Sequence, residues 1–317
     1  MTTGRAFWTV APGVGELRGE SLAAADVLVT SLASGISRGT EALVFAGRVP
    51  PSQFAAMRAP LMAGEFPFPV KYGYSAVGKT PDGGRVFVLH PHQDRFFAPA
   101  AMCVPVPDNV PTARAVLAAN METAVNIAWD AACLPGARVL VVGAGVVGLL
   151  VGSLMARVPG TEIVLVDINP KRARLAALFG CGFALPDAAP DDQDLVVHAS
   201  GSEPGLRIAL ACAGNEARVI EASWFGDRAP SVPLGEAFHA RRLRLIASQV
   251  GQIAPAMRGR RSHRQRLALA LRLLEDDRYD ALLEPATRFE DLPANMPRLL
   301  QGGLCHVIEY GMNTCSA

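Results

Sequence analysis

The stretch "VLVVGAGVVG", residues 139–148, decides how the rest of the sequence is interpreted. Its apolar run is followed by glycines at 143, 145 and 148, a spacing typical of a tight turn between a buried strand and a helix. The first glycine permits the turn, the second lets another group approach the backbone, and the third lets the helix pack closely. A membrane span over 139–156 is disfavoured because these 18 uncharged residues contain four glycines.

The next apolar run, "EIVLVD", ends in an acidic residue. Asp167 lies 19 residues after the third glycine, where a carboxylate can accept hydrogen bonds from both hydroxyls of a ribose. The free N–H groups at the start of the helix favour phosphate. The pattern therefore predicts a dinucleotide site that consists of Gly143, Gly145, Val146, Val147, Gly148, Asp167 and Arg172. Asp167 favours NAD(H) over NADP(H), although Lys171 and Arg172 could tolerate a 2′-phosphate; a domain that binds another nucleotide, or none, is the alternative.

Strands and helices alternate after residue 137. Apolar strands alternating with helices indicate a parallel sheet covered on both faces. We expect strands at 138–142, 162–167, 194–200, 217–223 and 243–248, and helices at 146–157, 170–179 and 203–213. Before this region, residues 112–132 have helical spacing, and the first 100 residues are β-rich, with strands at 26–34 and 85–91. The tail suggests helices at 262–275 and 291–300 and a strand at 305–310.

Composition excludes several classes of protein. The 317 residues suffice for two domains, and the formal net charge of +1 argues against a nucleic-acid partner or a membrane surface. The N-terminus has no apolar signal core, and none of the six cysteines is near another at metal-ligand spacing. We therefore expect a cytoplasmic protein with reduced thiols.

The segment "SGISRGTEALVF", residues 34–45, and the order of the elements resemble the medium-chain dehydrogenase/reductase superfamily, which is alcohol dehydrogenase-like. The resemblance implies an α/β fold: a Rossmann domain with a doubly wound parallel sheet, inserted into a GroES-like β-rich catalytic domain. It implies a catalytic domain over 1–120, a nucleotide-binding domain over 121–255 and a return to the catalytic domain over 256–317, with the active site in the cleft. It also implies cofactor contacts from Arg38, Ala199, Ser200, Gly201 and Ser223.

The sequence departs from the zinc members of that superfamily at the metal ligands. Ser37 occupies the position of the first cysteine, Gly73-Tyr74-Ser75 replaces Gly-His-Glu, and only Glu122 keeps a possible ligand. Serine and tyrosine hydroxyls are poor zinc ligands at neutral pH because each must lose a proton of high pKa. We therefore expect a subgroup without zinc.

Without a metal, hydrogen-bond donors must polarise the substrate. Ser37, Thr40 and Tyr74 are the candidates. His92, near His90 and Asp94 in "LHPHQDRF", could pair with the aspartate as a general acid or base, or belong to a polar turn.

Other candidates each have two interpretations. Glu122 could be a buried acid with a raised pKa, but a hydrogen bond to the loop around Ser37 is favoured. Trp224 and Phe225 line either the nicotinamide or substrate pocket or the core. Residues 239–274 contain nine arginines and no acid. They form either a patch for an anionic substrate or a solvated helix face paired with acids such as those of "LEDDRYD".

These observations together predict a zinc-independent NAD(H)-dependent oxidoreductase. It would transfer a hydride between nicotinamide and a small alcohol, carbonyl or conjugated carbonyl compound. The alternatives are an NADPH-dependent quinone or enone reductase of the same superfamily and a non-catalytic NAD(H)-binding regulatory protein. The expected partners are a small-molecule substrate and, from the resemblance, a second copy of the chain that pairs around residues 243–251.

Overall fold

The computed structural model describes residues 2–311 and divides into two compact units. The first unit comprises the residues up to Ala119 and from Leu267 onward, and the second comprises Asn120–Arg266. The expected boundary at 255 lies too early. The N–H of Ala254 and the guanidinium of Arg266 both donate to the Asn126 amide oxygen, so the segment between them belongs to the second unit.

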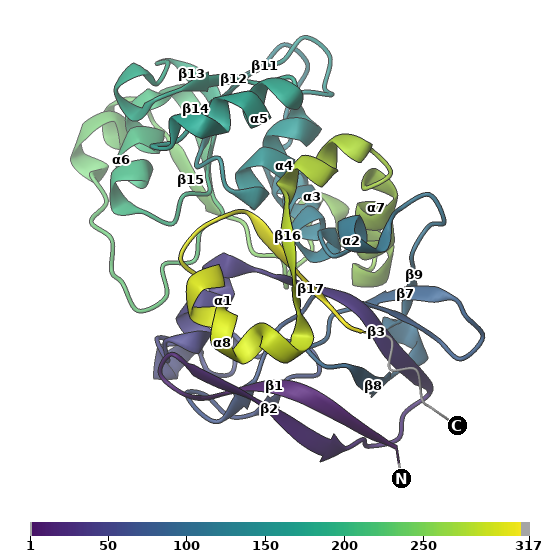
Figure 1. Cartoon of the computed structure of the whole chain (residues 1–317). Coiled ribbons are helices and arrows are strands. Elements are labelled where there is room, and N and C mark those ends of the chain that lie inside the picture. Colours follow the sequence, from purple (N-terminus) through teal and green to yellow (C-terminus); the bar gives the residue numbers. More distant parts are fainter. Residues whose placement is uncertain (1, 312–317) are drawn as a thin grey trace. The chain divides into compact units, whose positions relative to one another are not determined.

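The second unit contains a six-stranded sheet in the order β12-β11-β10-β13-β14-β15, with all neighbours parallel. The strands are β10 (Arg138–Val142), β11 (Glu162–Val166), β12 (Gly182–Ala184), β13 (Gln193–His198), β14 (Ala213–Glu221) and β15 (Arg244–Ala247). The order reverses between β10 and β13, which is the point where ligands bind in doubly wound sheets. The predicted Rossmann sheet is confirmed, and Figure 1 shows β11 to β15 with their helices.

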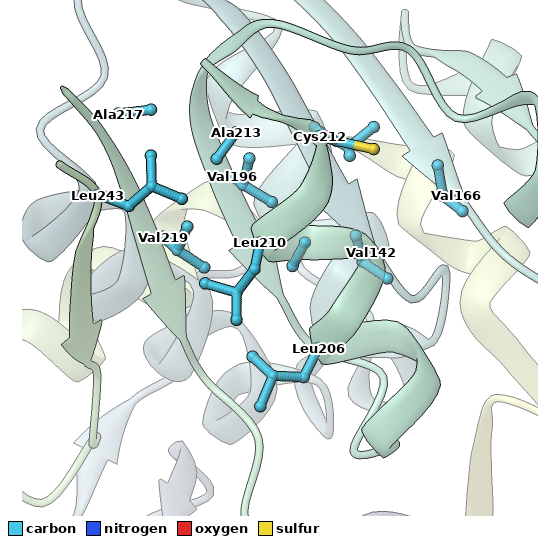
Figure 2. Packing of buried hydrophobic residues seen from close by; sticks show 12 residues of the cluster. Val142, Val166, Val196, Leu206, Leu210, Cys212, Ala213, Ala217, Val219 and Leu243 are labelled. Atoms are coloured by element: carbon cyan, nitrogen blue, oxygen red, sulfur yellow. The ribbon is translucent and has the colours of Figure 1, made fainter. Parts of the chain in front are cut away.

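Three helices cover this sheet: α4 (Val146–Met155), α5 (Ala173–Leu178) and α6 (Glu203–Cys212). Helix α4 packs on β10 and β11, and α6 packs on β10, β13 and β14. Figure 2 shows Leu206 and Leu210 of α6 against the valines of these strands. Burying a leucine side chain contributes roughly 1.5–3 kcal/mol, so this apolar cluster holds the strand ends in place.

The first unit contains two sheets, one in the order β2-β1-β5-β4 and one in the order β16-β17-β3-β6-β7-β9, with β8 also paired to β3. The strands are β1 (Thr3–Ala11), β2 (Val14–Ser21), β3 (Val27–Ile36), β4 (Ala63–Gly64), β5 (Val70–Lys71), β6 (Ala76–Lys79), β7 (Arg85–Val88), β8 (Arg95–Ala98), β9 (Val104–Pro105), β16 (Leu283–Arg288) and β17 (Cys305–Glu309). Strand β17 pairs antiparallel with β3, so the C-terminal return completes the sheet that the N-terminal part begins.

The remaining α-helices are α1 (Arg38–Phe45), α2 (Thr112–Ala115), α3 (Ala118–Ala131), α7 (His263–Leu273) and α8 (Leu292–Leu299). Shorter helical turns are η1 (Pro51–Gln53), η2 (Ala100–Met102), η3 (Pro170–Arg172), η4 (Pro186–Ala188), η5 (Leu234–Phe238), η6 (Pro255–Met257), η7 (Asp277–Leu282) and η8 (Phe289–Asp291).

The prediction of one continuous helix over 112–132 is wrong, because the segment is divided into the two helices α2 and α3. The carbonyl of Val116, between the two helices, accepts a hydrogen bond from the Ser75 hydroxyl. Over residues 2–311, we find no helix long and apolar enough to cross a membrane.

Candidate functional site

The glycine loop after β10 has the geometry that its spacing predicts. Gly143 has a left-handed backbone with φ of +105°, and a Cβ there would lie 2.7 Å from the backbone nitrogen of Ser200. A Cβ on Gly148 would lie 1.8 Å from the Gly143 carbonyl oxygen. At Gly145, by contrast, a Cβ would meet no described atom within 4 Å. Packing therefore requires the first and third glycines, whereas the second leaves the loop open to a ligand.

Helix α4 begins at this opening. Val146 and Val147 form its first turn, and no described side chain caps it. Its first N–H groups and its dipole therefore suit an anionic phosphate.

Asp167 follows β11 and lies against the glycine loop. One carboxylate oxygen accepts the N–H of Ala144 at 2.7 Å, and the other accepts the N–H of Asn169 at 2.8 Å. These bonds fix a negative charge at the edge of the loop. The next residue, Ile168, is 84% exposed and offers an apolar surface that sequence reasoning missed. Arg172 ends the following turn η3 and is half-buried.

The predicted contacts after β13 and β14 also come together in the second unit. The N–H of Ala199 donates to the Val142 carbonyl at 2.8 Å, which places the 199–201 segment beside the glycine loop. The N–H of Gly201 donates to the Ser223 hydroxyl at 3.0 Å. Phe225 packs on the apolar cluster of this unit, and Trp224 is half-buried.

The hydroxyl candidates of the first unit surround the start of α1. Ser37 immediately precedes the helix, and its N–H donates to the Glu41 carboxylate at 2.7 Å. The Tyr74 hydroxyl is hydrogen-bonded to the Ser37 and Thr40 side chains. Burial of the hydroxyl, reinforced by the Glu41 charge, raises the pKa of Tyr74 to about 12, while the two hydrogen bonds oppose the shift. Tyr74 is therefore a neutral phenol that can donate a hydrogen bond at neutral pH. Arg38, in the first turn of α1, is exposed.

A chain of buried side chains lies behind these hydroxyls. The Glu41 carboxylate lies 2.9 Å from Nε2 of His92, and Nδ1 of His92 lies 2.7 Å from the Ser34 hydroxyl. Ser34 in turn contacts the Tyr310 hydroxyl at 2.8 Å. His92 does pair with a carboxylate, as one of the two interpretations of "LHPHQDRF" has it, but the carboxylate is that of Glu41 and not of Asp94. Both ring nitrogens of His92 have other partners, and Asp94 accepts the backbone N–H and the guanidinium of Arg5.

His90 is a buried neutral histidine rather than an acid or base for neutral pH. Its ring stacks on Phe96 with 3.6 Å between centroids, and its Nδ1–H donates to the Pro91 carbonyl at 2.9 Å. Burial is the largest cause that lowers its pKa, to about 3.

Glu122 pairs with a cation, not with the expected hydrogen-bond partner in the loop around Ser37. Its carboxylate lies 3.1 Å from Nε of Arg266, and the two side chains are 6% and 1% exposed. Burial raises the pKa of Glu122, and the Arg266 charge opposes that shift. The same guanidinium donates to Asn126 and to the Val250 carbonyl. The Glu122 carboxylate is thus already neutralised by a buried cation.

Nowhere in residues 2–311 do three His, Cys, Asp or Glu side chains gather in a way that could hold a metal ion.

The arginine run of residues 239–274 divides between structural and exposed roles. Arg266 is its buried member, whereas Arg258, Arg260 and Arg261 are exposed. Among the acids of "LEDDRYD", Asp280 pairs with Arg114 of α2 and Asp276 pairs with Arg278.

The chain matches no known family model. In sequence it is 28% identical over 133 residues to L-threonine 3-dehydrogenase of Ruegeria pomeroyi, covering 41% of this chain and 39% of the relative. It is also 28% identical over 131 residues to a protein named probable D-xylulose reductase A of Neosartorya fischeri, covering 36% of this chain and 37% of the relative. The matches thus span less than two-fifths of these relatives' length.

Solved structures match along nearly the whole chain. L-idonate 5-dehydrogenase from Escherichia coli has a TM-score of 0.79 at 15% identity, over 97% of this chain and 98% of that one. An alcohol dehydrogenase from Escherichia coli, in complex with NADH, has a TM-score of 0.78 at 14% identity, over 98% and 100% of the two chains. A protein described as a zinc-binding dehydrogenase from Sinorhizobium meliloti, bound to NADP, has a TM-score of 0.77 at 14% identity over the same shares. At these identities the likeness establishes the fold.

The buried His90 predicts a specific pH dependence of stability. The pKa of His90 is about 3 in the folded chain and about 6.5 when unfolded, so the unfolded chain binds a proton that the folded chain does not. The stability associated with the neutral ring is fully present above pH 6.5 and is lost as the pH falls towards 3. The loss in the free energy of unfolding is about 3 kcal/mol at pH 4. His90→Asn keeps an amide N–H that can donate to the Pro91 carbonyl but has no group that titrates. The free energy of unfolding, measured with urea, should therefore fall less steeply between pH 6.5 and pH 4 in this variant.

Substitution of an exposed histidine, His239→Asn, is the matched control and should keep the slope. An unchanged slope in His90→Asn would contradict the assignment of a neutral, buried His90.

Arg266 should be far more costly to replace than its exposed neighbours. Arg266→Met leaves the Glu122 carboxylate buried and unpaired, which costs about 3–5 kcal/mol in the free energy of unfolding. Adding Glu122→Gln removes the stranded charge and should recover part of the loss. Arg260→Met, in the exposed part of the same run, should change stability by less than about 0.5 kcal/mol. Urea unfolding of the three variants measures this, and an equal cost for both arginines would refute the pairing.

Proposed function

We propose that this chain, an alcohol dehydrogenase-like member of the medium-chain dehydrogenase/reductase superfamily, is a zinc-independent NAD(H)-dependent oxidoreductase of small alcohol, carbonyl or conjugated carbonyl compounds. The observation that carries the proposal is the Asp167 carboxylate, hydrogen-bonded to Ala144 beside an open glycine loop. A bound nicotinamide cofactor would supply or accept the hydride.

The second unit supplies what such a cofactor needs. The first turn of α4 offers N–H groups to the pyrophosphate, and Gly145 leaves room for its approach. The Asp167 carboxylate can accept hydrogen bonds from ribose hydroxyls, and its charge repels a 2′-phosphate. The exposed Ile168 provides an apolar surface next to this carboxylate for an adenine ring. These features favour NAD(H), while Arg172 nearby is the residue that would otherwise accommodate NADP(H).

The donors of the first unit support a mechanism without zinc. Tyr74, Ser37 and Thr40 form one hydrogen-bonded group, and the raised pKa of Tyr74 keeps its proton in place. A neutral hydroxyl can donate to a substrate oxygen on which negative charge develops, and one such donor contributes a factor of roughly 10²–10³ in kcat. A tyrosine with this pKa is correspondingly unsuited to bind zinc as a phenolate.

The surroundings of Glu122 also disfavour a metal cation. Its charge is already balanced by the Arg266 guanidinium, so Zn²⁺ bound to this carboxylate would be repelled by a buried positive charge. We therefore assign Glu122 a structural role, as the anchor of the segment that ends at Arg266.

Replacing Asp167 should change cofactor preference. Asp167→Asn keeps an acceptor for the Ala144 N–H but removes the charge, so NADH should bind at least about tenfold more weakly and NADPH more tightly. Asp187→Ser, at an exposed acid in η4, is the control and should leave both dissociation constants unchanged. Isothermal titration with each cofactor measures this. Unaltered NADH affinity in Asp167→Asn would remove the role assigned to Asp167.

Replacing Tyr74 should separate catalysis from cofactor binding. Tyr74→Phe should lower kcat by roughly 10²-fold in NADH-dependent reduction of a panel of aldehydes, ketones and enones, with the NADH dissociation constant unchanged. Tyr72→Phe is the matched control, because the Tyr72 hydroxyl donates to the Met57 carbonyl. Elemental analysis of the same preparations should find no stoichiometric zinc.

About one zinc per chain would overturn the metal-free mechanism. Tight NADH binding without turnover on any substrate of the panel would instead favour a regulatory protein.

A further inference from the structure

A histidine and a glutamate that sequence reasoning passed over meet at the ends of β13 and β14. His198 and Glu221 are the last residues of these strands and lie opposite each other in the parallel register. Nδ1 of His198 lies 2.7 Å from one Glu221 carboxylate oxygen, and Nε2 lies 2.7 Å from the Ser200 hydroxyl. His198 is fully buried, whereas Ser200 is exposed. A line of hydrogen bonds thus leads from a half-buried carboxylate, through a buried ring, to an exposed serine hydroxyl.

The carboxylate determines where the protons of this line lie. The second oxygen of Glu221 accepts the N–H of Ser223 at 2.7 Å, so both oxygens act as acceptors. A carboxylate beside Nδ1 favours the tautomer that carries its hydrogen there, which leaves Nε2 as an acceptor. In that tautomer the Ser200 hydroxyl gives its own hydrogen to Nε2. Its oxygen is left as an acceptor. It accepts the N–H of Ser202 at 3.3 Å, and its other lone pair is open either to the Ser202 hydroxyl, 2.8 Å away, or to a ligand.

The segment that presents Ser200 is tied on both sides to the loop after β14. The N–H of Gly201 donates to the Ser223 hydroxyl at 3.0 Å, and the carbonyl of Gly201 accepts the Arg228 guanidinium at 2.7 Å. Phe225 of the same loop stacks on the His198 ring, with 6.0 Å between centroids. These contacts hold the backbone around Ser200, so the direction of its oxygen is set by the fold.

The location of Ser200 identifies the half of the cofactor that it would meet. Its backbone nitrogen lies beside Gly143, at the point where the strand order reverses. A doubly wound fold has two mononucleotide-binding halves, and Asp167 belongs to the half that takes the adenosine ribose. The ends of β13 and β14 belong to the other half, which faces the nicotinamide nucleotide.

We infer that Glu221 and His198 are positioning residues that make Ser200 a hydrogen-bond acceptor for the nicotinamide nucleotide. The donor is either a hydroxyl of the nicotinamide ribose or the N–H of the carboxamide. This inference rests on the proposed function, since it requires that a nicotinamide cofactor binds. It adds that the tautomer of the buried His198 determines whether the exposed Ser200 accepts a hydrogen bond from the cofactor or donates one.

Glu221→Gln tests the tautomer directly. The Gln oxygen must face the Ser223 N–H, so its NH₂ group faces His198 and donates to Nδ1. The hydrogen of His198 should move to Nε2, which then donates to Ser200 and reverses the polarity of its hydroxyl. Two-dimensional ¹H–¹⁵N NMR of the histidine rings, assigned with a His198→Gln sample, should show the Nδ1–H tautomer in the unmodified chain and the Nε2–H tautomer in the variant. The Nε2–H tautomer in the unmodified chain would overturn the inference.

Ligand binding tests the consequence. Ser200→Ala and Glu221→Gln should each weaken NADH binding by roughly tenfold, the effect of losing one hydrogen bond, and the double variant should be no weaker than either single one. AMP, which lacks the nicotinamide half, should bind all variants equally. A loss that extends to ADP-ribose identifies the ribose hydroxyl as the donor, and a loss confined to NADH identifies the carboxamide. Glu203→Gln is the matched control, because this acid at the start of α6 pairs with Arg207 at the surface.

The outcomes separate this inference from the proposed function. NADH binding that is insensitive to both Ser200→Ala and Glu221→Gln would overturn the inference alone, as would equal losses of AMP and NADH affinity. Absence of NADH binding by the unmodified chain would overturn the proposed function, and the inference with it.

Discussion

The close packing of Gly148 on the Gly143 carbonyl is the constraint on which the candidate cofactor site of the second unit depends. A single Cβ on Gly148 would lie 1.8 Å from that oxygen, so α4 can start at the loop only because the side chain is absent. The same loop carries Ala144, whose N–H holds Asp167, and it abuts the backbone of Ser200. Because Gly143 and Gly148 have no side chains, a carboxylate, a helix N-terminus and a serine can lie close together at one edge of the sheet.

The sequence predicted five of the six strands of the parallel sheet, because their signals are local. Apolar runs, glycines and the acid that follows β11 lie within short windows, and these five strands reappear with similar bounds, whereas the short β12 was not expected. The side-chain partners were not predictable, because they depend on how distant segments come together. Glu41 and His92 are 51 positions apart, and Glu122 and Arg266 are 144 apart. In "LHPHQDRF" the nearest carboxylate, Asp94, therefore suggested the wrong partner for the histidine.

Three carboxylates, of which two are buried and that of Glu221 is half-buried, illustrate how a partner decides what an acid can do. Glu122 is paired with a guanidinium, which is always charged, so its negative charge is cancelled permanently. Glu41 and Glu221 are paired with histidines, whose rings can be neutral and whose second nitrogen passes the effect on to Ser34 or Ser200. An acid beside arginine anchors a segment, whereas an acid beside histidine determines the hydrogen-bond direction of a more distant hydroxyl.

This distinction bears on the substrates that a zinc-free site would accept. A zinc ion stabilises an alkoxide with its positive charge, whereas Tyr74 offers a neutral hydroxyl whose pKa is raised by burial and by the nearby Glu41 charge. The Tyr74 hydroxyl attracts the charge that develops on a substrate oxygen, whereas the Glu41 carboxylate repels it, so this donor stabilises an alkoxide less than zinc does. A substrate whose charge is delocalised needs less stabilisation at the oxygen. Within the proposed function, conjugated carbonyl compounds, whose reduction spreads the charge over an enolate, therefore suit this site better than simple ketones.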